Sequence, residues 1–366
     1  MHLALYRAFR PKTFEEVIGQ DHIVSALKNQ IATGKIGHAY LFTGTRGTGK
    51  TSCAKIFAKA INCQNPQNGS PCGKCEACLA LDDPSNVDIL EMDAASNNGV
   101  DEIRSLREKI KYPPIHGKYK VYIIDEVHML TDSAFNALLK TLEEPPSHAV
   151  FILATTEVYK LPQTILSRCM RFDFRLVSKE LLQKHIANVF DKIGVKYDEQ
   201  STEVIALAGE GSVRDSLSVA DCVVAFCGDH ITIDRTLDVL GTSDKKCVLD
   251  LCDKIFDRDL GGVLSTIDEI YRSGKNLIAF GKEMTTHFKD LIVIKTCASP
   301  QKILNETSET FALMKEQAGK TTSENLIVFM QKFSEMESEL KYALSPRTLI
   351  ELVSLECASY DPAKKN

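Results

Sequence analysis

The sequence predicts an α/β fold in which helices cover a parallel β-sheet and helical domains follow. Up to residue 177, short apolar runs of strand length alternate with amphipathic runs of helical length, and strands joined through helices pair in parallel. From Ser178 onward the helical periodicity continues and the strand pattern fades. A length of 366 residues also exceeds one ordinary core, so we expect domains at 1–177, 178–242 and 243–366.

The expected elements follow one another in a regular order. The predicted strands of the first domain are 39–43, 87–93, 120–128, 149–156 and 170–174. The predicted helices are 21–32 before the first strand, and 51–60, 97–111 and 133–143 between later strands. The second domain has helical patterns at 180–193, 201–208 and 212–226. The third is helical from about 245 to 360, with an apolar seam that includes Val263, Ile267, Ile270, Leu277 and Phe280.

The first domain is organised around a glycine-rich motif between the strand 39–43 and the helix 51–60. It fits G-x-x-x-x-G-K-[ST], in which backbone N–H groups curl around phosphate oxygens. Lys50 is expected to reach the terminal phosphates, and the Thr51 hydroxyl to ligate Mg²⁺. A glycine-rich turn without a ligand is the alternative, and the flanking elements argue against it. The predicted phosphate-binding residues are Gly44, Thr45, Arg46, Gly47, Thr48, Gly49, Lys50 and Thr51.

Polar side chains end two of the later strands. Asp125 and Glu126 close the strand 120–128, and Thr156 closes the strand 149–156. The carboxyl ends of parallel strands lie at one edge, where ligands bind. Asp125 can therefore hold Mg²⁺ directly or through water, Glu126 can deprotonate an attacking water, and Thr156 can touch that water or the γ-phosphate.

Two arginines and one lysine have open interpretations. Arg168 either pairs with a local carboxylate or projects onto the γ-phosphate bound in a neighbouring subunit, as an arginine finger does. Arg214 begins a helix behind a glycine hinge and can reach back to bound nucleotide. Lys140 lies in the helix 133–143, where the plain interpretation is a solvated face.

Four of the 12 cysteines form a cluster. Cys72, Cys75 and Cys78 lie at C-x₂-C spacing, and Cys63 follows the preceding helix closely enough to join them. Four thiolates satisfy tetrahedral Zn²⁺, and no open position suggests catalysis. The alternatives are an iron–sulfur or redox site and an incidental grouping, although the bacterial iron–sulfur spacing is absent. The other cysteines are expected to be packed thiols, as at Cys222 and Cys227.

The N-terminal arm and the overall charge give weaker signals. Residues 6–14 are basic and aromatic, and with Val17 and Ile18 they can fold over an adenine ring; an arm that only packs on the domain is the alternative. The net charge of −5 gives no overall basic field for nucleic acid, so such contact must be local or supplied by partners. Without a signal peptide or a long apolar run, we expect a cytoplasmic protein with no membrane contact.

Together these motifs closely resemble the gamma/tau subunits of bacterial DNA polymerase III, the ATPases of the sliding-clamp loader in the AAA+ superfamily. The resemblance is carried by the phosphate loop, the cysteine module, Asp125–Leu130, Asn136–Pro146 and Ser167–Cys169, and it spans essentially the whole chain. It implies an AAA+ P-loop ATPase domain with a zinc module at about 62–80, a helical lid and a helical collar, with ATP, Mg²⁺ and Zn²⁺ as ligands.

The resemblance also implies residue roles. Arg168 becomes the finger acting on a neighbouring subunit, Arg214 the lid sensor and Thr156 the first sensor. Lys140 matches a DNA-facing basic position, whereas Asn97, Asn98 and Gly99 are not basic as in some family members. The implied contacts on the adenine side are Tyr6, Ala8, Arg10, Pro11, Val17 and Ile18.

The implied partners are the delta and delta-prime subunits and further copies of this chain, held in a ring by the collar, together with the beta sliding clamp and primer-template DNA. Polymerase core and helicase bind a longer C-terminal region in the tau form; it is missing here, so a gamma-like product or a fragment is expected. A phosphotransferase, a non-hydrolysing ring scaffold and a Holliday-junction motor are the rival interpretations. The cysteine module argues against the last of these.

Overall fold

The computed structural model describes residues 3–83, 86–240, 243–274, 276–304, 306, 308–340, 343 and 345–361. The chain forms two compact units, Met1–Thr232 and Ile233–Asn366, which are described separately. The boundary predicted near residue 242 adjoins Gly241 and Thr242, which lie outside the described residues. The division into three domains stays a prediction.

The first unit contains the predicted parallel sheet. Its strands are β1 (Ala39–Thr43), β2 (Ile89–Asp93), β3 (Lys120–Asp125), β4 (Ala149–Thr155) and β5 (Met170–Asp173). They pair in the order β2-β3-β4-β1-β5, and every pairing is parallel. The register sets Thr43 opposite Thr155 and Asp93 opposite Asp125, so the carboxyl ends of the strands meet at one edge.

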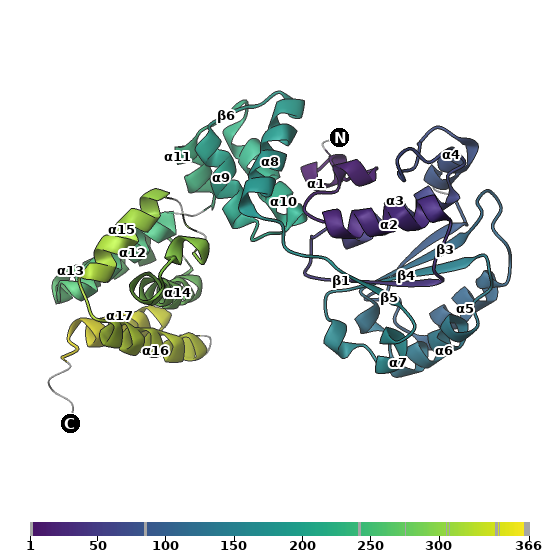
Figure 1. Cartoon of the computed structure of the whole chain (residues 1–366). Helices are drawn as coiled ribbons and strands as arrows, with labels where there is room; N and C mark the ends of the chain where they lie inside the picture. The colour runs from purple at the N-terminus through teal and green to yellow at the C-terminus, as the bar shows by residue number, and fades with distance from the viewer. Residues whose placement is uncertain are drawn as a thin grey trace. The chain divides into compact units, whose positions relative to one another are not determined.

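Helices cover both faces of this sheet (Figure 1). One face packs on α2 (Asp21–Thr33) and α3 (Lys50–Asn62), and the other on α5 (Val100–Ile110), α6 (Asp132–Glu143) and α7 (Gln163–Leu166). Side chains of β1 alternate between the two cores, because successive residues of a strand point to opposite faces. Tyr40 and Phe42 join the α2/α3 core, and Ala39 and Leu41 join the other.

Short elements complete the sheet domain. They are α1 (Leu5–Ala8), η1 (Phe14–Glu16), α4 (Glu76–Asp82), η2 (Val127–Met129) and η3 (Val158–Lys160).

A helical lid ends the first unit. It consists of α8 (Lys179–Ile193), α9 (Glu199–Ala208) and α10 (Val213–Cys227), each within two residues of its predicted limits. Two short parallel strands, β6 (Lys196–Tyr197) and β7 (His230–Ile231), were not predicted. Two residues are too few to give a period in the sequence.

The second unit is helical. Its elements are α11 (Ile233–Leu240), α12 (Ser243–Phe256), α13 (Leu260–Arg272), α14 (Leu277–Thr296), η4 (Pro300–Lys302), α15 (Ser308–Gly319), α16 (Ser323–Leu340) and α17 (Pro346–Ala358). The predicted seam residues, from Val263 to Phe280, are all buried in its core. Within the described part of the chain, no helix is both long and apolar enough to span a membrane.

Candidate functional site

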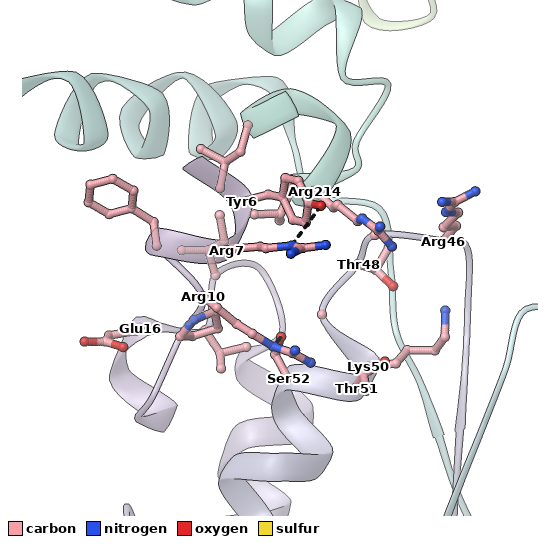
Figure 2. Close-up of a pocket in the computed structure, with 18 of the residues that line it drawn as sticks. Tyr6, Arg7, Arg10, Glu16, Arg46, Thr48, Lys50, Thr51, Ser52 and Arg214 are labelled. Atoms are coloured by element: carbon pink, nitrogen blue, oxygen red, sulfur yellow. Dashed lines mark hydrogen bonds between the residues drawn. The ribbon is translucent and has the colours of Figure 1, made fainter. Parts of the chain in front are cut away.

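A cavity of about 650 Å³ opens in the first unit between the N-terminal segment, the phosphate loop, the end of β3 and the lid (Figure 2). The predicted site residues that line it are Tyr6, Arg10, Pro11, Val17, Ile18, Arg46, Gly47, Thr48, Gly49, Lys50, Thr51, Asp125, Glu126 and Arg214. The predicted residues outside its wall are Ala8, Gly44, Thr45, Thr156, Arg168 and the four cysteines of the module. The structure thus brings the phosphate, magnesium and adenine candidates to one cavity.

The phosphate loop has the backbone that its glycines permit. Gly44 and Gly47 have φ of 139° and 76°. A Cβ at Gly44 would lie 2.4 Å from the Phe174 carbonyl oxygen, so no other residue fits there without a backbone shift. Lys50 Nζ donates to the carbonyls of Gly44 and Thr45 at 2.7 and 2.8 Å. Desolvation lowers the pKa of Lys50, against the opposing effect of the nearby carboxylates.

Two side-chain oxygens that can ligate a metal ion lie next to each other at the N-terminus of α3. Thr51 Oγ1 donates to Asp125 Oδ2 at 2.6 Å, which joins the first turn of α3 to the end of β3. A hydroxyl and a carboxylate at the same point are ligands that Mg²⁺ accepts, usually together with substrate phosphates and water. The donor set therefore fits the predicted ion.

Glu126 is held by the neighbouring strand end. Its backbone is left-handed, with φ of 47°, and its side chain turns toward β4. Glu126 Oε2 accepts from the Thr156 backbone N–H at 3.2 Å and from Thr156 Oγ1 at 3.0 Å. The buried His128 ring lies beside it, with Nδ1 3.4 Å from Glu126 Oε2 and 3.0 Å from Thr155 Oγ1. The orientation of Glu126 thus depends on the end of β4.

The lid touches the phosphate loop directly. The backbone N–H groups of Val213 and Arg214, at the start of α10, donate to the Gly47 carbonyl at 3.1 and 3.3 Å. The Arg214 guanidinium lies over the Tyr6 ring, 5.1 Å from its centroid (Figure 2). A hydrogen bond from Arg7 lowers the pKa of Tyr6. The N-terminal segment, the lid and the loop therefore form one wall of the cavity.

Arg168 and Lys140 lie away from the cavity of their own chain. Arg168 Nη2 pairs with Glu143 at 2.7 Å, and Nη1 donates to the Thr164 carbonyl at 2.8 Å. About one third of the Arg168 side chain is exposed. Within this chain Arg168 therefore makes the local ion pair. Its action on a neighbouring subunit stays a prediction. Lys140 is exposed, which is consistent with a solvated helix face.

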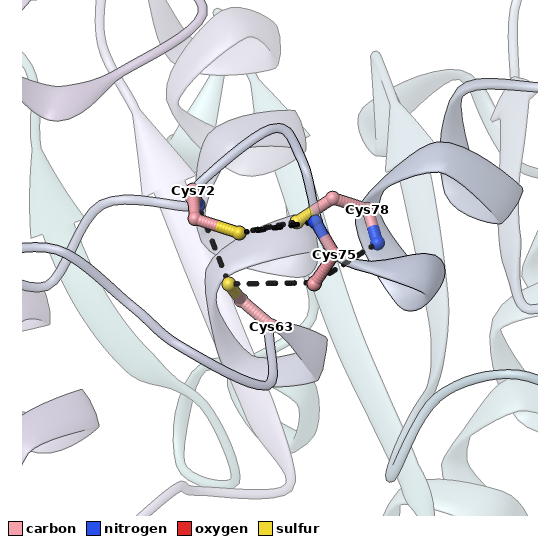
Figure 3. A group of neighbouring side chains, drawn as sticks. All are labelled: Cys63, Cys72, Cys75 and Cys78. Atoms are coloured by element: carbon pink, nitrogen blue, oxygen red, sulfur yellow. Dashed lines mark hydrogen bonds between the residues drawn. The ribbon is translucent and has the colours of Figure 1, made fainter.

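The four predicted cysteines form one cluster (Figure 3). Cys63 ends α3, and Cys75 precedes α4. The Sγ atoms of Cys63 and Cys75 lie 3.9 Å apart, those of Cys72 and Cys78 lie 4.0 Å apart, and all four lie within 4.8 Å of one another. Thiolates around one tetrahedral Zn²⁺ are about 3.8 Å apart, given Zn–S bonds of about 2.3 Å. The cluster fits a single ion better than a [4Fe–4S] cluster, in which each of the four thiolates binds a different iron.

Backbone amides favour the thiolate form of two of these cysteines. Hydrogen bonds from Lys74 and Cys75 lower the pKa of Cys72. Desolvation raises the pKa of Cys75, but N–H groups of Cys78 and Gln64 outweigh it and bring the value to about 6. Outside the cluster, the expectation of packed thiols holds for Cys227 and is wrong for Cys222, which is exposed on the outer side of α10.

Several residues of the cavity wall were not predicted. They are Glu16, Ser52, Glu91, His185, Val213 and Leu217, whereas Arg7 and Phe9 belong to the arm 6–14 that was expected to fold over adenine. Ser52 directly follows the motif and accepts from Arg10 Nε at 3.0 Å, so its position in the sequence was a usable signal. No such signal exists in the sequence for the lid residues His185, Val213 and Leu217, because their approach to the loop depends on how the lid packs.

Three consecutive segments of the chain match known protein families. Residues 19–178 match the family "DNA polymerase III, delta subunit", and residues 181–229 match "DNA polymerase III clamp loader subunit, ATPase lid domain". Residues 231–365 match "DNA polymerase III subunits gamma and tau domain III". The chain thus resembles polymerase III subunits in all three segments.

Individual polymerase III subunits are also similar to the chain. The chain is 43% identical to DNA polymerase III subunit tau of Bacillus subtilis over 351 residues, which are 95% of this chain and 62% of that relative. It is 36% identical to DNA polymerase III subunit gamma of Buchnera aphidicola, over 97% of this chain and 98% of the relative. Among solved structures, the RuvB Holliday-junction branch migration motor of Thermotoga maritima is similar at 22% identity and a TM-score of 0.49, over 75% of this chain and 85% of that one. The chain spans about three fifths of the length of the Bacillus relative. It belongs to the family of bacterial DNA polymerase III gamma and tau subunits.

Proposed function

We propose that this chain is the ATP-hydrolysing motor subunit of a bacterial clamp loader, which places a beta sliding clamp on primed DNA. The observation that carries the proposal is the convergence of Lys50, Thr51, Asp125 and Glu126 on one cavity beside the lid. The family to which the chain belongs supports the same function.

The residues divide the chemistry among them. The loop amides and Lys50 bind the β- and γ-phosphates, and Thr51 with Asp125 would hold Mg²⁺, which neutralises charge on those phosphates. Glu126 orients the attacking water and accepts its proton, and Thr156 positions Glu126 through the two hydrogen bonds of this structure. Arg214, stacked on Tyr6, reports nucleotide binding to the lid.

The cluster of Cys63, Cys72, Cys75 and Cys78 would hold a structural Zn²⁺. The sulfur separations support this assignment, and four protein ligands leave no position for a substrate. Its contribution is therefore to the fold of the 62–80 segment and not to catalysis.

The assembly follows from the family. The chain is expected to share a ring with delta, delta-prime and further copies, held through its second unit, with Arg168 acting on nucleotide bound by the adjacent subunit. Lys140 is the candidate for contact with the DNA backbone. Polymerase core and helicase are expected to bind only through a further C-terminal region.

Two substitutions test the catalytic assignment. Lys50→Ala should abolish nucleotide binding, measured by equilibrium titration of the isolated chain. Glu126→Gln should bind ATP like the wild type but hydrolyse it at least about 100-fold more slowly in the presence of delta, delta-prime, clamp and primed DNA, because a general base contributes at least this factor.

A matched control is Glu108→Gln on α5, which removes an exposed carboxylate that pairs with Lys111 and does not line the cavity. It should keep most of the activity. Wild-type hydrolysis by Glu126→Gln would refute the assigned base. Following labelled γ-phosphate to an acceptor other than water would favour a phosphotransferase instead.

A further inference from the structure

The loop that leads into Cys72 contains a tight two-residue turn. Gln67 and Ser70 exchange backbone hydrogen bonds, each of 2.8 Å. Asn68 and Gly69 between them have φ of 49° and 80°. Positive φ at both central residues is typical of a type I′ turn, which asparagine followed by glycine adopts at low cost. The turn fixes Ser70 two residues before a zinc ligand.

Ser70 is the point where this loop meets the N-terminal segment. It is only 3% exposed. Its Oγ donates to Glu15 Oε2 at 2.6 Å and accepts from the Phe14 backbone N–H at 3.0 Å. Lys28 Nζ pairs with the other Glu15 oxygen at 2.5 Å, and a Cβ at Gly69 would lie 2.7 Å from Lys28 Cγ. The turn is therefore packed tightly against α2 and bonded to η1.

The segment that Ser70 holds lies between two stretches of the cavity wall. Residues 6–11 precede it, and Glu16, Val17 and Ile18 follow it directly. Phe14 anchors the segment in the α2/α3 core with 1% exposure, and the Lys12 N–H donates to Glu16 Oε2 at 2.7 Å. Any movement of residues 14–15 would displace the wall on both sides.

We propose that the four-cysteine module is a positioning element for the nucleotide cavity, and that it acts through Ser70 on Phe14 and Glu15. The inference rests on the proposed function, because it concerns nucleotide binding. The four cysteines would hold a metal ion that keeps the loop in place at Cys72. The loop holds Ser70, and Ser70 positions Phe14 and Glu15, which directly precede the wall residues 16–18. Ser70, Glu15 and Lys28 are thus positioning residues, and none of them lines the cavity.

The test measures the affinity of the isolated chain for a fluorescent ATP analogue in the presence of Mg²⁺. Ser70→Ala should weaken binding about fivefold to tenfold, as expected when one buried and one partly buried hydrogen bond are lost. Removal of zinc with a chelator that does not bind Mg²⁺ should weaken wild-type binding by a similar factor. Applied to Ser70→Ala, the same chelator should add little, because both changes break the same connection. Lys28→Met, which leaves Ser70 intact, should give a smaller loss.

Controls separate this effect from general destabilisation. Asp82→Asn breaks the Lys59–Asp82 ion pair, which joins the module to α3 without reaching residues 14–18. Ser354→Ala removes a buried hydroxyl of the second unit. Both variants should bind nucleotide like the wild type, and Ser70→Thr, which keeps the hydroxyl, should bind better than Ser70→Ala.

The outcomes are distinct. If the wild type binds the ATP analogue and Lys50→Ala does not, the proposed binding site stands. In that case, unchanged affinity in both Ser70→Ala and the zinc-depleted protein would overturn only the proposed connection between the cysteine module and the cavity. Additive losses from chelation and Ser70→Ala would also overturn it. If the wild type fails to bind nucleotide, the proposed function itself fails.

Discussion

Replacing Gly47 by alanine tests whether the lid rests on the phosphate loop in solution. The φ of Gly47 is 76°, in the left-handed region that costs a residue with a Cβ about 1–2 kcal/mol. The new Cβ would also lie 1.9 Å from Ser212 Oγ, so the serine must rotate. Rotation breaks the cap that Ser212 Oγ provides to the Asp215 N–H at 3.2 Å, a loss of about 1 kcal/mol. Together these effects predict a destabilisation of about 2–3 kcal/mol.

A double-mutant cycle separates the two contributions. Ser212→Gly alone should cost only a few tenths of a kcal/mol, because glycine is an acceptable cap residue. In the Ser212→Gly background, Gly47→Ala no longer meets the hydroxyl, so it should cost only the backbone contribution of about 1–2 kcal/mol. The cycle should therefore show a coupling of about 1 kcal/mol between two residues that are far apart in the sequence.

Hydrogen exchange read by mass spectrometry is the suitable assay. The chain has two compact units, so a single unfolding curve does not report on the first unit alone. The slowest amides of β3 and β4 report the stability of that unit, and peptides of 210–218 report opening of the lid. Equal losses for Gly47→Ala in the two backgrounds would refute the contact between lid and loop.

Two further predictions concern Arg168 and His287. Arg168→Ala should leave nucleotide binding by the isolated chain unchanged and should lower hydrolysis about 1,000-fold or more in the assembled complex; an equal loss of binding in the isolated chain would contradict action across a subunit boundary. Burial, with a smaller effect of Lys245, lowers the pKa of His287 to about 4. Because the unfolded chain then binds more protons between pH 6.5 and 4, the free energy of unfolding should fall by about 1.4 kcal/mol for each unit of acidification across that window, and by about 3 kcal/mol in total. His287→Gln should lower the slope by this amount, measured from the slowest-exchanging amides of α14 by hydrogen exchange at several pH values, and an unchanged slope would show that other groups cause it.

The sequence was most informative where function depends on neighbours in the chain. The phosphate loop places its glycines, Lys50 and Thr51 within eight consecutive residues, so their spacing defines the loop backbone. The apolar strands predicted the sheet. Because Asp125 and Glu126 end one of these strands, they were predicted to lie near the phosphate loop. The cysteine spacing predicted the cluster for the same reason, because C-x₂-C brings sulfurs together within one turn.

Contacts between segments that are distant in the chain could not be predicted from the sequence. Nothing in the local pattern indicates that Ser70 bonds to Glu15, that Thr156 holds Glu126, or that α10 begins on the Gly47 carbonyl. The pairing of Arg168 with Glu143 likewise depends on the approach of α6 and α7.

The residue types and their spacing by themselves determined which chemistry this chain can carry: phosphate binding, a magnesium site and a four-thiolate site. The tertiary structure alone decided how those sites connect, with the lid bonded to the loop and the cysteine module bonded to residues 14–15, next to the wall of the cavity. The physical reason is that hydrophobic periodicity specifies which face of an element is buried but not which partner covers it. That choice is made by the packing of the whole unit.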